Sequence, residues 1–345
     1  MVFYEREINL NRSEEANKVR GFLNSLGLKF PEGSEYTVGV FYGEEIVGTG
    51  SLAGSVLQGI GIAPQFQGEG ISARIITNLM KKALGKGREH LFIFTKPETA
   101  AQFQNLGFKK VAEALPFAVL LEWGGQGIDG FKSHLMKISR NKPEGASCIV
   151  VNCNPFTMGH RYLIEKAARE SPWLYILVVE EDRSLFPFHV RFRLIKEGVK
   201  DLKNLSVIPG GEYVISSATF PSYFTREEDL AAAQASLDLE VFSTHIAPPL
   251  KVIKRYVGEE PYCPVTSVYN RCMKELLPQK GIQVVEVPRL KIGVEAVSAS
   301  RVRELIKRGG VEKTRELVPE STYSYLVSPE AREVIERIKR SSSRH

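Results

Sequence analysis

The part of the chain from residue 146 onwards alternates between strand and helix patterns. Short apolar runs, typical of buried strands, are followed by segments in which apolar residues recur every three or four positions. We expect strands at 148–153, 174–180, 206–208, 240–244 and 283–287, and helices at 160–169, 190–201, 227–237 and 300–308. Such alternation favours an α/β fold with a doubly wound parallel sheet and helices on both faces. Sheets of this kind bind ligands beyond the carboxyl ends of their strands, where the strand order reverses.

The first 125 residues have a different pattern. Strand patterns follow one another directly, and Gly43-Glu44 is expected to form a hairpin turn. The strands are expected at 36–42, 45–52, 56–62, 90–95 and 118–123, and the helices at 14–26 and 71–84. This order predicts an α+β domain with a meandering sheet. A glycine-rich break at 124–127 and a second break at 141–145, which contains Pro143 and Gly145, flank a short amphipathic stretch at 131–138. We therefore expect domains at 1–125 and 146–345, joined by a linker at 126–145.

Composition excludes several classes of protein. With 43% hydrophobic and 25% charged residues, the chain has the profile of a soluble globular protein. The longest strongly apolar run, at 173–179, is too short to span a bilayer, and no leader pattern opens the chain. We therefore expect a cytoplasmic protein without a membrane partner. No two of the four cysteines have C-x-x-C spacing, so we predict buried thiols and no metal-ligating residues.

The positive charge lies in the second part of the chain. Residues 1–125 hold 13 basic and 13 acidic side chains, whose charges cancel. The net charge of +6 therefore lies in the rest of the chain. A basic domain suits a polyanionic ligand such as a nucleotide, or an acidic partner protein. No long basic stripe interleaved with aromatic residues is present, and nucleic acid is therefore not expected as a partner.

Two segments of the second domain have features of a phosphate site. In the first, which runs from Asn152 to His160, a strand ends, a turn with Pro155 follows, and a helix begins. Unpaired backbone N–H groups and the positive end of a helix would then lie at the edge of the sheet. Gly159 would allow close approach to the backbone, and Thr157 and His160 would donate hydrogen bonds. In the second segment, at 297–303, Ser298 and Ser300 are candidates for capping a helix in which Arg303 lies one turn further on.

Together these segments resemble two motifs of the nucleotidyltransferase superfamily of HIGH-type adenylyl transferases. Thr157, Gly159 and His160 match its T/H-x-G-H motif, and 297–303 matches I-S-S-T-x-x-R with mild replacements. The resemblance implies a Rossmann-like domain in which His160, Thr157 and Arg303 are catalytic. It also implies a set of ATP-binding residues, which comprises Asn152, Asn154, Pro155, Phe156, Gly159, Arg191, Ser298 and Ser300.

The first domain resembles the GNAT acetyltransferases. The segment 63–73 joins a strand to a helix and is similar to the Q/R-x-x-G-x-G/A loop of that family, and 99–108 is similar to its later helix ending in Leu-Gly-Phe. In GNAT proteins the loop cradles the pyrophosphate of coenzyme A. The resemblance implies that Gln67, Gly68, Gly70 and Ser72 bind a coenzyme-A-like group, and Ser72 departs from the family's Gly/Ala. A purely structural domain is the alternative, because no acid or base stands out beyond unsupported candidates in Tyr42 and Glu69.

The combination of the two domains resembles the citrate lyase ligase family over nearly the whole chain. That family uses acetate and ATP to acetylate the thiol of the coenzyme-A-like prosthetic group on the acyl-carrier subunit of citrate lyase. The resemblance therefore implies ATP with Mg²⁺ on its phosphates, acetyl-adenylate as intermediate, and the carrier subunit as partner. Two other functions remain open: an adenylyltransferase whose acceptor is a phosphate, such as phosphopantetheine or a mononucleotide, and a non-catalytic sensor of nucleotide and acetyl-coenzyme A. Acyl specificity has no readable motif, so acetate rests on the resemblance alone.

Overall fold

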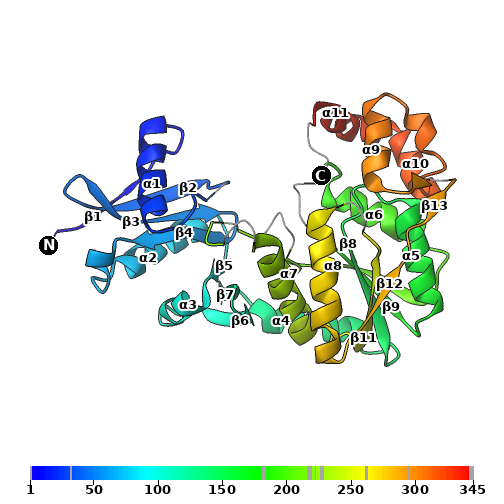
Figure 1. Cartoon of the computed structure of the whole chain (residues 1–345), viewed down its shortest axis with the longest axis horizontal. Coiled ribbons are helices and arrows are strands. Elements are labelled where there is room, and N and C mark those ends of the chain that lie inside the picture. The colour runs from blue at the N-terminus through cyan, green and yellow to red at the C-terminus, as the bar shows by residue number, and fades with distance from the viewer. Residues whose placement is uncertain are drawn as a thin grey trace. The chain divides into compact units, whose positions relative to one another are not determined.

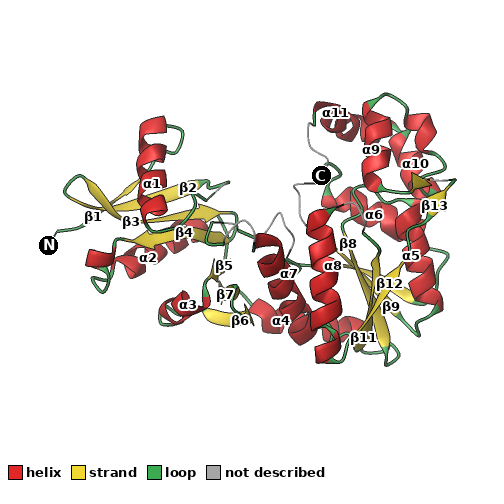
Figure 2. Ribbon diagram, viewed as in Figure 1, coloured by secondary structure: helices red, strands yellow, loops and turns green. Residues whose placement is uncertain are grey.

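The structure is a computed structural model of the 345-residue chain. It describes residues 2–31, 33–180, 184–215, 220–221, 223–225, 229–260, 263–293 and 295–341. The chain divides into two compact units, shown in Figures 1 and 2. The first comprises Met1–Gly130 and Phe220–Glu240, and the second comprises Phe131–Thr219 and Val241–His345. Residues 220–240, which we expected in the second domain, therefore belong to the first unit.

The first unit is built on a seven-stranded mixed sheet with the order β1-β2-β3-β4-β5-β7-β6. Its strands are β1 (Tyr4–Glu7), β2 (Tyr36–Tyr42), β3 (Glu45–Ala53), β4 (Val56–Ile62), β5 (His90–Thr95), β6 (Lys109–Ala114) and β7 (Ala118–Gly124). Its helices include α1 (Ser13–Ser25), α2 (Ile71–Leu84) and α3 (Pro97–Gln104). All strand pairs are antiparallel except β4 and β5. The α+β domain expected from the sequence is thus confirmed in type.

Helix α2 packs closely on the middle of this sheet. It buries Ile71, Ile75 and Leu79, which recur at helical spacing. At Gly48 in β3, a Cβ atom would lie 2.7 Å from a methyl group of Ile71. Glycine at this position therefore sets the short distance between helix and sheet, and through it the position of the loop that precedes α2.

The parallel pair β4–β5 is short, and aromatic residues from much later in the chain lie beside it. The paired register covers only Val56 with Phe92 and Leu57 with Ile93. Further along β5, the carbonyl of Phe94 accepts a hydrogen bond of 2.9 Å from the Tyr223 hydroxyl. Phe220, Tyr223 and Phe224 are all buried, and the rings of Phe94 and Phe220 meet edge to face. These three residues, which we call the inserted aromatic residues, belong to the first unit, and Phe220 and Tyr223 contact β5 there.

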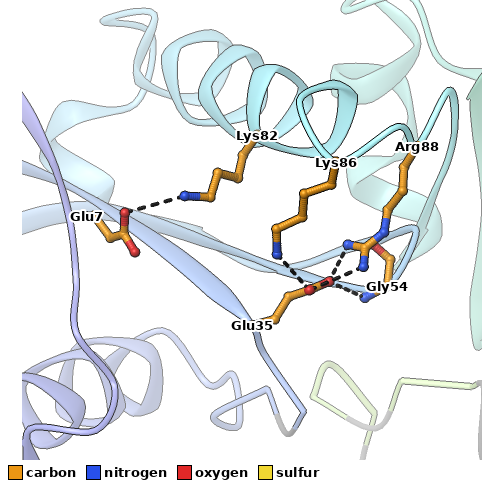
Figure 3. A network of polar contacts seen from close by, with 6 residues as sticks. All are labelled: Glu7, Glu35, Gly54, Lys82, Lys86 and Arg88. Carbon is orange, nitrogen blue, oxygen red and sulfur yellow. Dashed lines mark hydrogen bonds and ion pairs between the residues drawn. The ribbon is translucent and has the colours of Figure 1, made fainter.

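A network of ion pairs ties together three parts of the first unit (Figure 3). The carboxylate of Glu35, just before β2, binds both Arg88 and Lys86, which follow α2. It also accepts a hydrogen bond of 2.9 Å from the N–H of Gly54 in the turn between β3 and β4. The hydrogen bond from Arg88, followed by that from Lys86, holds the pKa of Glu35 at about 2. The network therefore fixes the C-terminal end of α2 against the sheet.

The second unit contains a five-stranded parallel sheet with the order β10-β9-β8-β11-β12. Its strands are β8 (Ala146–Val151), β9 (Leu174–Val178), β10 (Leu205–Pro209), β11 (Val252–Gly258) and β12 (Gln283–Val287). The chain runs outward from β8 through β9 to β10, then returns to β11 on the other side of β8. The order therefore reverses between β8 and β11, and the doubly wound parallel sheet expected from the sequence is confirmed.

Helices surround this sheet and a small hairpin lies after it. The helices are α4 (Gly127–Ser139), α5 (Met158–Arg169), α6 (Phe188–Gly198), α8 (Pro264–Leu276), α9 (Ala299–Lys307), α10 (Glu320–Leu326) and α11 (Arg332–Arg340). The hairpin pairs β13 (Lys291–Ile292) with β14 (Glu295–Ala296). Much of the segment expected as a linker thus forms α4. The core beneath α5 and α6 includes Phe156, Ile164, Ile176, Phe186 and Leu194.

The prediction of a strand at 240–244 is wrong. Helix α7 (Leu230–Val241) continues directly into a π-helical turn at Phe242–Ile246. Val241, Phe242 and Ile246 are buried, so apolar residues at neighbouring positions made a helix resemble a buried strand. The helix expected at 227–237 lies partly outside the described residues, and its described part is shifted toward the C-terminus.

Candidate active site

The turn between β8 and α5 lies at the carboxyl edge of the parallel sheet, beside the point where the strand order reverses. Three contacts from later parts of the chain hold its backbone. Arg303 donates to the carbonyl of Asn154 at 2.5 Å, and the Thr322 hydroxyl donates to the carbonyl of Phe156 at 3.0 Å. The N–H of Met158 donates to the carbonyl of Leu317 at 2.9 Å. The turn is therefore a fixed part of the second unit.

Thr157 and His160 form a reciprocal capping box at the start of α5. The N–H of His160 donates to the Thr157 hydroxyl oxygen, and the N–H of Thr157 donates to Nδ1 of His160 at 3.1 Å. The Thr157 hydroxyl also lies 2.9 Å from Nδ1. Because Nδ1 accepts a backbone N–H, a neutral His160 ring carries its proton on Nε2. The capping box thus leaves Nε2 as the hydrogen-bond donor of this side chain.

His160 is neutral at physiological pH. Burial and, to a smaller extent, the positive charge of Arg289 lower its pKa to about 4. Its ring also stacks on that of Phe156, with centroids 6.2 Å apart. The site therefore offers an uncharged N–H donor of fixed direction rather than an imidazolium.

A titration would test this protonation state. We expect the ring signals of His160 in a proton NMR spectrum to remain unchanged from pH 8 to about pH 5.5, since its pKa is about 4. The lowered pKa also predicts how the free energy of unfolding depends on pH. The unfolded chain protonates this histidine near pH 6.5 and the folded chain does not, so the folded state loses stability as the pH falls from 6.5 toward 4. The His160→Asn spectrum would assign the signals, and a midpoint near 6.5 would contradict the assignment.

The second predicted segment begins α9 and lies against the first. Ser298 is the N-cap of α9 and accepts a hydrogen bond of 3.2 Å from the N–H of Arg301, whereas Ser300 lies exposed in the first turn. A Cβ atom at Gly159 would lie 3.1 Å from the carbonyl oxygen of Val297. The structure therefore brings the two segments together, and glycine at 159 permits the contact.

Arg303 connects the same two segments. Its side chain comes from the second turn of α9, is only 9% exposed, and reaches the carbonyl of Asn154. Burial lowers its pKa, but an arginine remains charged at physiological pH. The site consequently holds a partly buried positive charge beside the start of α5.

Several residues expected to bind ATP face the protein instead. Arg191 is fully buried and donates to the carbonyls of Phe186, Asn152 and Val179, each at 2.9 Å. Phe156 is also fully buried. Side chains without an exposed surface support the turn and the segment before α6, and do not reach a ligand in this conformation.

The two asparagines of the turn join it to the same segment. The side-chain oxygen of Asn154 accepts from the N–H of Phe186 at 3.0 Å, and the side-chain amide of Asn152 donates to the Ser184 hydroxyl at 3.0 Å. Pro155 lies between them and Phe156 in the buried part of the turn. These contacts fix the backbone of the turn, including Cys153, whose φ of 55° is unusual for a residue other than glycine.

The predicted pyrophosphate loop of the first unit is exposed. Gly68 and Gly70 have φ values of 89° and 74°, and a Cβ atom at either would meet nothing within 4 Å. Gly70 is the N-cap of α2, which has no side-chain cap, and Gln67 is exposed whereas Ser72 is partly buried. The N-terminus of a 14-residue helix therefore faces open space at this loop.

Sequence reasoning did not find all neighbours of the two sites. The rings of Phe3, Tyr42 and Phe66 cluster beside the loop, with centroids 5.6–5.8 Å apart. Arg289 acts electrostatically on His160, although no motif contains it. These residues come from separate parts of the sequence, so only the fold shows their proximity.

Among the described residues, no group of three or more histidine, cysteine, aspartate or glutamate side chains could hold a metal ion. In the same described part, no helix has the length and apolar character that crossing a membrane requires.

Two known families match the chain. The family described as the citrate lyase ligase C-terminal domain matches residues 146–326, and the acetyltransferase (GNAT) domain family matches residues 12–118. The chain is also similar to three citrate (pro-3S)-lyase ligases. That of Klebsiella pneumoniae is 40% identical over 89% of this chain and 91% of its own length, and that of Haemophilus influenzae is 38% identical over 89% and 94%. That of Escherichia coli is 34% identical over 92% of each. The chain belongs to the citrate lyase ligase family, and its first part has the GNAT fold.

Proposed function

We propose that this protein uses acetate and ATP to acetylate the thiol of a coenzyme-A-like prosthetic group on the acyl-carrier subunit of citrate lyase. The name that its relatives share, citrate (pro-3S)-lyase ligase, supports citrate lyase as the partner. The observation that carries the proposal is the contact between Gly159 and Val297, which places the capping box of α5 beside the N-terminus of α9. This arrangement suits a triphosphate.

In the first step, an oxygen of acetate attacks the α-phosphorus of ATP. The new bond is the acyl–phosphate bond of acetyl-adenylate, and the bond that breaks joins the α-phosphorus to pyrophosphate. Acetate is already ionised at pH 7, so the step needs no general base. It needs alignment and stabilisation of the charge that develops on the leaving group.

The residues of the second unit supply those two requirements. Nε2–H of His160 is a fixed donor, and Gly159 contributes its backbone N–H at the N-terminus of α5. Thr157, whose N–H and hydroxyl both contact His160, holds the ring in place. Arg303 and the α9 N-terminus, with Ser298 and Ser300, attract the outer phosphates. ATP enters as its Mg²⁺ complex, with the ion on phosphate oxygens. Asn152, Asn154, Pro155, Phe156 and Arg191 act by holding the turn in shape.

In the second step, the sulfur of the prosthetic group attacks the acetyl carbonyl. A thioester bond forms, the bond between the acetyl group and AMP breaks, and the thiol proton is released to solvent. We propose that the exposed loop with Gln67, Gly68, Gly70 and Ser72 holds the pyrophosphate of the prosthetic group. Domain 1–125, together with residues 220–240, would then bind the prosthetic group of the carrier, and domain 146–345 would bind ATP.

The decisive experiment is mass spectrometry after incubation with ATP, Mg²⁺ and a set of short carboxylates. We expect AMP and pyrophosphate to form with acetate when the carrier subunit is present, and the carrier to gain an acetyl group. Release of pyrophosphate with phosphopantetheine or a mononucleotide, and not with acetate, would show an adenylyltransferase with a phosphate acceptor. Binding of ATP without any AMP would show a sensor. Either result would overturn the proposal.

A further inference from the structure

Arg289 lies at the same edge of the parallel sheet as the capping box. It follows β12 by two residues, and β12 pairs with β11 next to the point where the strand order reverses. The next residue, Leu290, accepts a hydrogen bond of 2.9 Å from the N–H of Val297. The carbonyl of Val297 in turn faces Gly159. A short chain of backbone contacts therefore connects Arg289 to the turn that holds His160.

Two acceptors after β11 hold the Arg289 guanidinium. Its Nε donates to the carbonyl of Glu259 at 2.8 Å, and its Nη2 pairs with the carboxylate of Glu260. The other oxygen of Glu260 accepts from the N–H of Cys263 at 3.2 Å. The side chains of Arg289 and Glu260 are 20% and 14% exposed, so water reaches the pair only in part. Because two bonds come from one side of a planar group, they fix the orientation of its fork.

The positive charge of Arg289 disfavours protonation of His160 and favours the binding of a polyanion. The charge of Arg289 acts on His160 in the direction that keeps its ring neutral. An arginine fork at the same edge of the sheet as a neutral N–H donor is an arrangement that suits phosphate oxygens, which accept from both. An ion pair that is largely withdrawn from water loses much of its Coulombic gain to desolvation, so stability alone gives a weak reason for the pair.

We propose that Arg289 is a further catalytic residue, whose guanidinium contacts the phosphates of ATP and the departing pyrophosphate, and that Glu260 is its positioning residue. The inference rests on the proposed function of the second unit. It gives the site two arginines that come from different elements: Arg303 from α9 and Arg289 from the loop after β12. The two would approach the phosphate chain from different elements.

The test compares Arg289→Ala and Arg289→Lys with the unchanged protein. We expect Arg289→Ala to lower acetate-dependent exchange of pyrophosphate into ATP by about 10²-fold and to weaken binding of magnesium pyrophosphate by at least about tenfold. Arg289→Lys retains the charge without the fork, and should recover only part of each loss. Added guanidinium ion should partly restore exchange in Arg289→Ala and leave Arg289→Lys unchanged.

Glu260→Gln tests the positioning role. The amide still accepts one hydrogen bond but does not fix the fork through charge, so we expect a lower rate of exchange with little change in pyrophosphate affinity. Glu260→Asp, which keeps the charge, should retain more activity than Glu260→Gln. Equal loss in both variants, together with a lowered melting temperature, would show a purely structural role.

Arg308→Ala is the matched control, because Arg308 is an exposed arginine of the same unit that pairs with Glu304 on the surface of α9. We expect it to leave exchange and pyrophosphate binding unchanged. If the unchanged protein shows no acetate-dependent exchange, the proposed function fails, and pyrophosphate binding measured by calorimetry still tests Arg289. Equal pyrophosphate binding by Arg289→Ala and the unchanged protein would overturn the inference, whatever the exchange result.

Discussion

His160→Asn is expected to lower acetate-dependent exchange of pyrophosphate into ATP by about 10²- to 10³-fold, which is the effect of removing one fixed donor from a developing negative charge. The asparagine oxygen can take the place of Nδ1 and accept the N–H of Thr157, so the capping box survives. The variant has no N–H where Nε2 stands. The variant therefore removes the donor and keeps the cap, and we expect its affinity for ATP to change little.

His160→Gln is the complementary variant. Glutamine closes capping boxes at this position, and its amide carries both an acceptor for the N–H of Thr157 and an N–H of its own. We expect His160→Gln to be about as stable as His160→Asn and to exchange faster, because its longer side chain brings an N–H closer to the position of Nε2. His160→Ala lacks both features and should abolish exchange. If both amide variants exchange as fast as the unchanged protein, His160 has no part in the first step.

Gly70→Val is expected to separate the two steps of the reaction. Valine would add a branched side chain where the N–H groups of the α2 N-terminus face open space, so the carrier arm would be excluded. We expect acetylation of the carrier to require at least about tenfold more carrier, which corresponds to a loss of about 1.4 kcal/mol. Acetate-dependent exchange of pyrophosphate, which the second unit performs, should remain unchanged.

Gly87→Val is the matched control for that experiment. Gly87 also has a φ of 74° and open space around a Cβ atom, but it lies beyond the opposite end of α2. Both substitutions therefore carry the same backbone cost of about 1–2 kcal/mol. Loss of carrier acetylation in both variants would indicate backbone strain, and loss of exchange in Gly70→Val would refute the division of labour between the units.

Much of the fold follows from local patterns. β2, β4, β5 and α2 begin and end at the predicted residues, because each has an apolar pattern of a single period and a glycine or polar residue at its ends. Helices α5 and α9 begin at Met158 and Ala299, within two residues of the predicted starts, because Thr157 and Ser298 cap them through their own hydroxyls. Helices and strands whose boundaries depend on residues close together in the sequence are thus the ones that the sequence predicts.

The features that the sequence does not predict have a different origin. The sequence does not predict β11, because Lys254 and Arg255 interrupt its apolar residues. Arg255 is nevertheless only 2% exposed, and is accommodated by the ring of Phe242 and the hydroxyl of Tyr269. Partners that lie outside the strand itself make that burial possible. The same holds at the site: Arg191 looks like a phosphate ligand in the sequence, but its fork is occupied by three carbonyls that only the folded chain brings together.

The inserted aromatic residues have a consequence for how the chain folds during synthesis. The strands of the first unit are complete once residue 124 has left the ribosome, yet Tyr223, which binds the carbonyl of Phe94, is made about one hundred residues later. At about 5–20 residues per second, that interval lasts roughly 5–20 s. During it, β5 lacks the packing of Phe220 and the hydrogen bond from Tyr223, while residues 131–219 of the second unit are being made. The first unit can therefore complete these contacts only after part of the second unit has been translated.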